Sequence, residues 1–130
     1  ACADGRFVAV GALEPQFHAE LLARLGLDAA EHGAQMDRTL WPRQHARLAA
    51  AFAQRSRDEW AAVFEHSEAC VAPVLDWAEA PEHPHNRARG AFVDIAGVTQ
   101  PAPAPRFSRT PPGVPEAPAA AGAHSEAVLR

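Results

Sequence analysis

The feature that most constrains the fold of this 130-residue chain is an abrupt change of composition after Gln100. Seven of the twelve prolines lie between Pro101 and Pro118, and alanine fills most of the gaps between them. Proline favours extended backbone and alanine has little surface to bury, so this stretch cannot form a core of its own. The sequence therefore predicts a folded domain over residues 1–100 and a Pro/Ala-rich extended segment with a mobile tail over residues 101–130.

Charge narrows the class of partner that the chain can bind. The formal net charge is -4, and all 12 basic residues are arginines that are dispersed along the sequence. A chain without a basic cluster lacks the positive surface that holds phosphate backbones or anionic lipids. No apolar run approaches the roughly 20 residues of a membrane-spanning helix, and no basic and then apolar leader opens the chain. We therefore expect a soluble, cytoplasmic protein with no nucleic-acid or membrane partner.

The cysteines and the chain ends add two expectations. Cys2 and Cys70 lie far apart and no disulfide-dense pattern surrounds them, which favours free thiols in a reducing compartment. The chain opens on a turn without an initiator Met, and residues 125–130 have the pattern of a helix cut short. We therefore expect this chain to be a fragment of a longer protein.

Periodicity and turn signals predict an α+β fold. Residues 6–11 alternate as a short strand does, and Pro15 then opens a helix that Gly26 ends. Residues 27–40 show no clean period and are assigned a surface loop with one helical turn and no function. The other predicted elements are helices over 41–54, from 56 and over 76–82, an edge strand over 69–75, an irregular segment over 83–86, and a strand over 90–95 turned by residues 96–98.

The third helix carries the clearest local signal. Ser56 and Glu59 match a capping box, in which the hydroxyl and the carboxylate satisfy free backbone amides at the helix start. Trp60, Val63 and Phe64 then form one apolar stripe. The sequence predicts that this stripe is buried.

Glu14 is the first candidate for chemistry. It stands between a predicted strand and a predicted helix, and a carboxylate at such a junction projects from the end of a sheet, where a ligand can approach. A carboxylate at a helix start also has a purely local role, because it complements the exposed N–H groups there. The residues alone favour the local role over catalysis.

His83 and His85 could face one metal ion from an extended segment, but a site needs a third and usually a fourth ligand, and none stands at ligand spacing. A hydrogen-bonding loop is the favoured interpretation. Cys70 lies in an apolar run without a neighbouring charge, which favours a buried, inert thiol over a nucleophile.

Four arginines, Arg87, Arg89, Arg106 and Arg109, could grip phosphates, but their wide spacing and acidic neighbours favour pairing at the surface. PxxP-like spacings in the proline-rich segment suit an aromatic-lined partner groove, but an intramolecular connector is the simpler explanation and is favoured. The sequence has no glycine-rich phosphate loop, no serine elbow and no HExxH motif. The residues taken alone indicate a small α+β domain of unknown role.

Several strings, taken together and in order, resemble the C-terminal part of the α-methylacyl-CoA racemase family, within the class III CoA-transferase superfamily. They are CADGRFVAVG at residues 2–11, LEPQF at 13–17, DEW at 58–60, CVAPVL at 70–75, HPHNRARG at 83–90 and QPAPAPRFS at 100–108. The resemblance covers residues 2–111, and the remaining tail matches only faintly. It implies the small α+β domain of that fold, followed by the strap that returns to a large domain.

The resemblance also implies an activity. Such enzymes invert the α-carbon of 2-methyl-branched acyl-CoA thioesters, a reaction of lipid metabolism, by removing a proton from one face and returning it on the other. Two acid/base groups on opposite faces are needed, together with donors for the enolate oxygen. In the family these groups are a histidine and an aspartate of the large domain, outside these 130 residues. The resemblance further implies an interlocked homodimer, acyl-CoA as substrate, no metal or redox cofactor, and an isolated chain without activity.

One catalytic position carries over to this chain, and it is Glu14. In the family the acidic residue of the Glu-Pro-Gln motif lies beside the catalytic histidine of the partner subunit. A carboxylate there orients the imidazole ring and favours its protonated form. The resemblance therefore reverses the preference for a local role, whereas His83, His85 and Cys70 receive no role from it.

Two other functions remain open. A class III CoA-transferase would move CoA between carboxylic acids through an aspartyl thioester, and the Glu14-Pro15-Gln16 string favours the racemase over it. A non-catalytic interaction module would engage a partner through residues 101–118.

Overall fold

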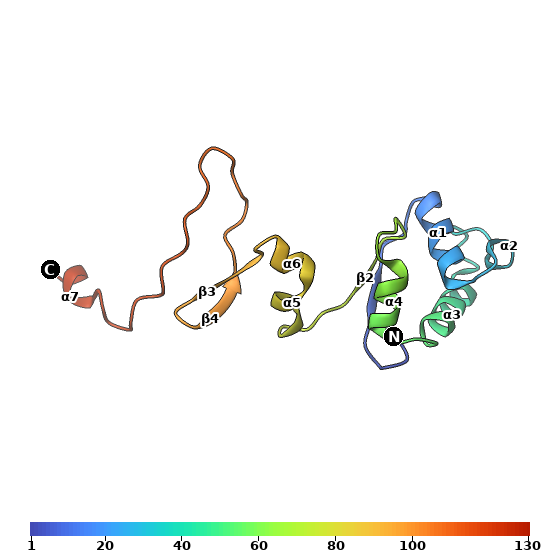
Figure 1. The fold of residues 1–130 in the computed structure, drawn as a ribbon, viewed down its shortest axis with the longest axis horizontal. Helices are drawn as coiled ribbons and strands as arrows, with labels where there is room; N and C mark the ends of the chain where they lie inside the picture. The colour runs from blue at the N-terminus through green and yellow to red at the C-terminus, as the bar shows by residue number, and fades with distance from the viewer. The chain divides into compact units, whose positions relative to one another are not determined.

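The computed structural model describes residues 1–130. The chain forms two compact units, Ala1–Val74 and Leu75–Arg130, called here the N-terminal and C-terminal units. Helices and short antiparallel strands occur in both (Figure 1). The predicted α+β class is confirmed.

The N-terminal unit contains a two-stranded sheet and four helices. In chain order these are β1 Val8–Val10, α1 Pro15–Leu25, α2 Ala29–His32, α3 Trp41–Phe52, α4 Arg57–Phe64 and β2 Val71–Pro73. The two strands pair antiparallel with Val8 opposite Pro73, so the predicted edge strand is confirmed. Helix α4 packs beside this pair (Figure 1).

Helix α1 begins and ends where its sequence signals predict. Pro15 occupies the first turn, where its missing N–H costs no hydrogen bond. Gly26 adopts the left-handed conformation at φ 69°, and its N–H donates to carbonyls of the last turn. A side chain would be strained at this φ, which explains why glycine stands there.

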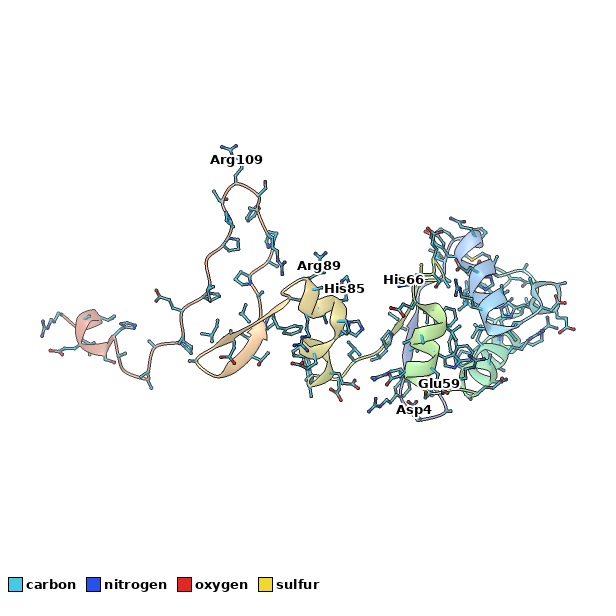
Figure 2. The ribbon with its side chains drawn as sticks, in the orientation of Figure 1. Asp4, Glu59, His66, His85, Arg89 and Arg109 are labelled. Carbon is cyan, nitrogen blue, oxygen red and sulfur yellow. The ribbon has the colours of Figure 1, made fainter.

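Helix α4 is fixed at its start by two sets of hydrogen bonds. The capping box is present: Ser56 Oγ accepts from the Glu59 backbone N–H at 3.3 Å, and Glu59 Oε2 accepts from the Ser56 backbone N–H at 2.8 Å. The hydrogen bond from the Ser56 hydroxyl is the main cause that lowers the pKa of the Glu59 carboxyl. Asp4, at the same end of the helix in Figure 2, accepts from the Arg57 backbone N–H at 3.2 Å.

Three aromatic rings form the centre of the core. The Phe52 and Trp60 ring centroids lie 5.5 Å apart at a steep angle, and Phe64 lies 5.9 Å from Trp60. The Trp60 indole N–H donates to the Phe52 carbonyl at 2.9 Å, so the buried ring leaves no polar atom unsatisfied. The predicted burial of Trp60 and Phe64 is confirmed, and Val63 packs against the core while half-buried.

The C-terminal unit contains three short helices and a hairpin. They are α5 Glu79–Glu82, α6 Pro84–Ala88, β3 Phe92–Ile95, β4 Val98–Pro101 and α7 Ser125–Val128. The hairpin turns at Ala96 and Gly97, both at positive φ, as a tight two-residue turn requires.

Two expectations for the C-terminal unit are wrong. The segment predicted to be irregular at residues 83–86 forms the start of α6, because extended His83 serves as the cap and Pro84 takes the first helical position. Strand β4 was not predicted, since its residues read as a turn and a connector, yet it pairs with β3 with Phe92 opposite Pro101.

The predicted domain boundary after residue 100 rests on composition alone and stays a prediction. Strand β4 runs across that position, so the first proline of the proline-rich segment belongs to a hairpin. No helix of the chain combines the length and the hydropathy that crossing a membrane needs.

Candidate functional site

Glu14 stands where the loop after β1 enters α1. It is the helix cap, with φ -70° and ψ 144°, and its carbonyl accepts from the His18 N–H at 2.9 Å. Its side chain is exposed and makes no capping hydrogen bond. The structure thus contains no hydrogen bond for the local role of this carboxylate.

The backbone in front of Glu14 is held by a side chain from a distant part of the sequence. Gln35 Nε2 donates to the carbonyls of Ala12 and Leu13, each at 3.0 Å. The Trp41 indole N–H in turn donates to the Gln35 carbonyl at 3.0 Å. These bonds tie the junction to the segment before α3, so the position of Glu14 is set by long-range contacts.

A cavity of about 460 Å³ opens next to this junction. Its apolar lining comes from β1, the junction, α1 and α3, and includes Val10, Leu13, Leu21, Trp41 and Leu48. Its polar lining consists of three histidines and two glutamines, His18, His32, His45, Gln35 and Gln44, and no charged residue lines it. The volume and the mostly apolar lining are those of a small-molecule site.

Two of the histidines form a pair inside the N-terminal unit. The His18 and His32 ring centroids lie 5.4 Å apart, and His32 is 1% exposed. Burial lowers the pKa of both imidazoles, and for His32 the nearby His18, Arg47 and Arg43 lower the pKa further. Both rings are therefore neutral at pH 7. His32 Nδ1 is buried and has no hydrogen-bond partner.

Gln44 secures the backbone around His32. Its Nε2 donates to the His32 carbonyl at 3.3 Å and to the Ala34 carbonyl at 3.0 Å. These two bonds use both amide hydrogens of Gln44, and the residue itself is buried. Gln35 and Gln44 therefore shape the wall of the cavity, and their donors are already engaged.

A second cavity, of about 380 Å³, shares His18 and Gln35 with the first. It is lined from α1 by Pro15 and Leu22, and from the segment after α2 by Met36. It lacks the tryptophan and the other two histidines of the first cavity.

The predicted burial of Cys70 is wrong. Cys70 is exposed and sits at φ 51°, where the chain turns into β2, so its side chain does not enter the core as a regular strand residue would. Cys2 is the buried thiol, and burial is the main cause that raises its pKa. Both cysteines are free.

The histidines and arginines of the C-terminal unit occupy its surface. Figure 2 shows His85 and Arg89 extending from α6 and Arg109 from the segment after β4. Arg87 forms an ion pair with Glu82 at 3.1 Å, which confirms the predicted surface pairing for this residue. Arg106 donates to the Gly90 carbonyl at 2.7 Å. No three His, Cys, Asp or Glu side chains are grouped to hold a metal ion.

Sequence reasoning missed most of the cavity. Residues 27–40 were assigned no function, yet His32 and Gln35 line the cavity and Gln35 fixes the backbone at Leu13. The one available signal was a cluster of histidine, glutamine and tryptophan over residues 32–45, in a stretch without periodicity. Such a cluster has no fixed spacing, so it could not be assigned to a site.

Comparison with known proteins yields relatives that are much longer than this chain. It is 46% identical to Alpha-methylacyl-CoA racemase of Mus musculus over 131 aligned positions, which are 98% of this chain and 34% of the mouse protein. It is 42% identical to Alpha-methylacyl-CoA racemase of Homo sapiens over 110 positions, 84% of this chain and 29% of the human protein. The chain therefore spans about a third of the length of these relatives.

A solved structure shares the fold. The crystal structure of Rv3272 from M. tuberculosis superposes with a TM-score of 0.73 over 97% of this chain and 36% of that one, at 18% identity. The family model of CoA-transferase family III matches residues 1–125. On this match and on the two racemase relatives, the chain belongs to CoA-transferase family III.

Proposed function

We propose that this chain is part of an isomerase that inverts the α-carbon of 2-methyl-branched acyl-CoA thioesters. The observation that carries the proposal is the 46% identity to the mouse racemase over 98% of the chain. The Glu14-Pro15-Gln16 string supports the proposal. So does the side chain of Glu14, which is exposed and makes no capping hydrogen bond.

In this proposal, Glu14 acts on a histidine of the partner subunit in an interlocked homodimer. An α-proton is removed from one face of the thioester and a proton is returned on the other, so two acid/base groups are needed. This chain holds neither member of the pair. Glu14 accepts a hydrogen bond from the partner imidazole, which fixes the ring orientation and stabilises its protonated form. The acyl-CoA is the substrate, and the reaction takes place in the cytoplasm without a metal or redox cofactor.

The test is a set of substitutions in the full-length protein. Glu14→Gln keeps the shape of the side chain and removes its charge. We expect the rate of epimerisation of a 2-methylacyl-CoA to fall roughly 100-fold or more, because an acid/base group loses its positioning and its charge partner. Glu116→Gln, in the exposed proline-rich segment, is the matched control and retains full activity.

A pH profile separates this role from a structural one. Loss of a carboxylate next to an imidazolium lowers the pKa of that imidazole, so the acid limb of the kcat profile moves to lower pH in Glu14→Gln. Unchanged turnover with an unchanged profile and an intact far-UV circular dichroism spectrum contradicts a catalytic role for Glu14.

A second function is supported by the family match to CoA-transferase family III. Such an enzyme moves CoA between two carboxylic acids through an aspartyl thioester. Incubation in D₂O distinguishes the two reactions: the isomerase incorporates deuterium at the α-carbon without a second carboxylic acid. The transferase requires that second acid, because the acid accepts the CoA from the thioester.

A further inference from the structure

The backbone that leads into Glu14 is held by one side-chain amide. Residues 11–14 connect β1 to α1 and belong to neither element. Gln35 Nε2 donates to two successive carbonyls of this connection, those of Ala12 and Leu13, each at 3.0 Å. A glutamine amide nitrogen carries two hydrogens, so these bonds use all of its donors. Gln35 therefore fixes the two peptide groups that precede Glu14.

This contact sets one of the two peptide planes that meet at the Cα atom of Glu14. The Leu13 carbonyl and the Glu14 Cα atom belong to the same planar peptide group, so a donor that holds the carbonyl holds the plane. The plane on the other side is held by α1, because the Glu14 carbonyl accepts from the His18 N–H at 2.9 Å. The two planes together set φ and ψ of Glu14, and these angles direct its Cα–Cβ bond.

Gln35 is itself held from α3. The Trp41 indole N–H donates to the Gln35 carbonyl at 3.0 Å. Gln44 Nε2 donates to the carbonyl of the preceding residue, Ala34, at 3.0 Å, and Gln44 is buried. A continuous series of hydrogen bonds therefore runs from α3 through Gln35 to the connection in front of Glu14.

The carboxylate of Glu14 depends on this backbone for its direction. Its side chain is exposed and makes no capping hydrogen bond with α1. A displacement of about 1 Å at a group that takes part in a reaction is enough to lower the rate about 100-fold. A small rotation of the Leu13–Glu14 peptide group would move the carboxylate by such an amount, since the side chain extends the lever.

We propose that Gln35 is a positioning residue for the reaction, and that it acts through Glu14 by holding the Leu13–Glu14 peptide plane. This inference rests on the proposed function, in which the Glu14 carboxylate meets an imidazole of the partner subunit. Gln35 touches neither the substrate nor that imidazole. Its contribution is the direction from which the carboxylate approaches the ring.

The experiment removes the two donors of Gln35 in the full-length protein. Gln35→Met keeps the approximate length of the side chain and has no N–H group. Gln35→Asn keeps the amide but is one methylene shorter, so it cannot reach both carbonyls, and it is the second variant should the first fail to fold. Gln54→Met is the matched control, because Gln54 is exposed in the turn after α3.

We expect Gln35→Met to lower kcat for epimerisation of a 2-methylacyl-CoA about tenfold or more. KM should change less than about twofold, because the substrate itself loses no contact. Gln35→Asn should lower kcat by a smaller factor, and Gln54→Met should change neither constant.

A double-mutant cycle with Glu14→Gln separates positioning from a general loss of structure. Once the charge of Glu14 is gone, its direction matters little, so adding Gln35→Met to Glu14→Gln should lower kcat by less than about twofold further. A merely structural contribution of Gln35 would lower kcat by the same factor in both backgrounds.

Equal factors in both backgrounds, or wild-type kcat in Gln35→Met and Gln35→Asn, would overturn the inference. A racemase in which the two substitutions are additive loses only the role of Gln35. A wild-type protein that moves CoA between acids and does not epimerise loses the isomerase proposal, and the positioning role falls with it.

Discussion

The two units of this chain differ in how much apolar surface they bury. Nine of the ten buried apolar residues lie in the N-terminal unit, and Ile95 is the only one in the C-terminal unit. The N-terminal unit is held by an aromatic core and long-range hydrogen bonds. The C-terminal unit depends on local turns, a short hairpin and the stiffness of proline. Equivalent substitutions in the two units should therefore have very different consequences.

The largest difference is expected between two tryptophans. Trp60 is 4% exposed in the core and Trp77 is 93% exposed. In the full-length protein, Trp60→Ala should lower the free energy of unfolding by about 3–5 kcal/mol, because it removes a packed ring and leaves a cavity. Trp77→Ala should stay within about 0.5 kcal/mol of the wild type. Urea denaturation followed by circular dichroism measures both values, and equal losses would show that burial does not distinguish the units.

The second prediction concerns acid stability. The unfolded chain binds protons at His18 and His32 near pH 6.5, whereas burial holds the pKa of both imidazoles lower in the folded state. The stabilisation is therefore fully present above pH 6.5 and is lost as the pH falls toward the folded pKa values. The expected slope is at most about 1.4 kcal/mol per pH unit for each histidine.

Three groups near His32 lower the pKa of its imidazole in addition to burial. His18 comes from α1, and the Arg43 and Arg47 guanidiniums come from α3, so each disfavours a protonated His32. Arg47 also pairs with Glu31 at 3.1 Å, which offsets part of its charge. His32→Gln should flatten the pH dependence of unfolding, and His124→Gln, in the exposed C-terminal segment, should leave it as it is. A wild-type protein that gains stability between pH 6.5 and 5 would contradict this assignment.

The third prediction concerns the capping box. Ser56→Ala removes the hydroxyl that accepts from the Glu59 N–H and should cost about 1 kcal/mol. Ser108→Ala, an exposed serine of the C-terminal unit, should cost almost nothing. Amide exchange in the first turn of α4 should also accelerate in Ser56→Ala. If exchange there stays at the wild-type rate, Asp4 alone is sufficient to cap the helix.

Elements that depend on neighbouring residues could be predicted from the sequence. Pro15 and Gly26 delimit α1, and Ser56 with Glu59 starts α4, because each signal acts within one turn of the backbone. The same local rule failed at Pro84. A residue before proline is indeed extended, but the proline itself then opened a helix instead of prolonging the loop.

The cavity and the hairpin could not be predicted in this way, because their contacts join residues far apart. Gln35 reaches the Ala12 carbonyl 23 residues back, and nothing in the sequence near either residue indicates that pairing. Strand β4 begins with Val98 and Thr99, which favour strands, but it is short and ends on a proline. It becomes a strand because the tight turn at Gly97 brings it beside β3. The junction position alone makes Glu14 a candidate, but only the family resemblance favours a catalytic role for it over a local one.

The last comparison is between two arginines that make the same kind of bond in different surroundings. Arg57 is buried and donates to the Val74 carbonyl at 3.0 Å, whereas Arg106 is exposed and donates to the Gly90 carbonyl at 2.7 Å. Without Arg106, water replaces the guanidinium at the carbonyl, so Arg106→Ala should change the free energy of unfolding by less than about 0.5 kcal/mol. Arg57 is buried and also pairs with Asp58 at 2.8 Å, so water replaces its contacts less readily and Arg57→Ala should cost about 1–3 kcal/mol. The shorter hydrogen bond is thus expected to contribute less to the free energy of unfolding. Urea denaturation of the two variants decides whether bond length or burial governs that contribution.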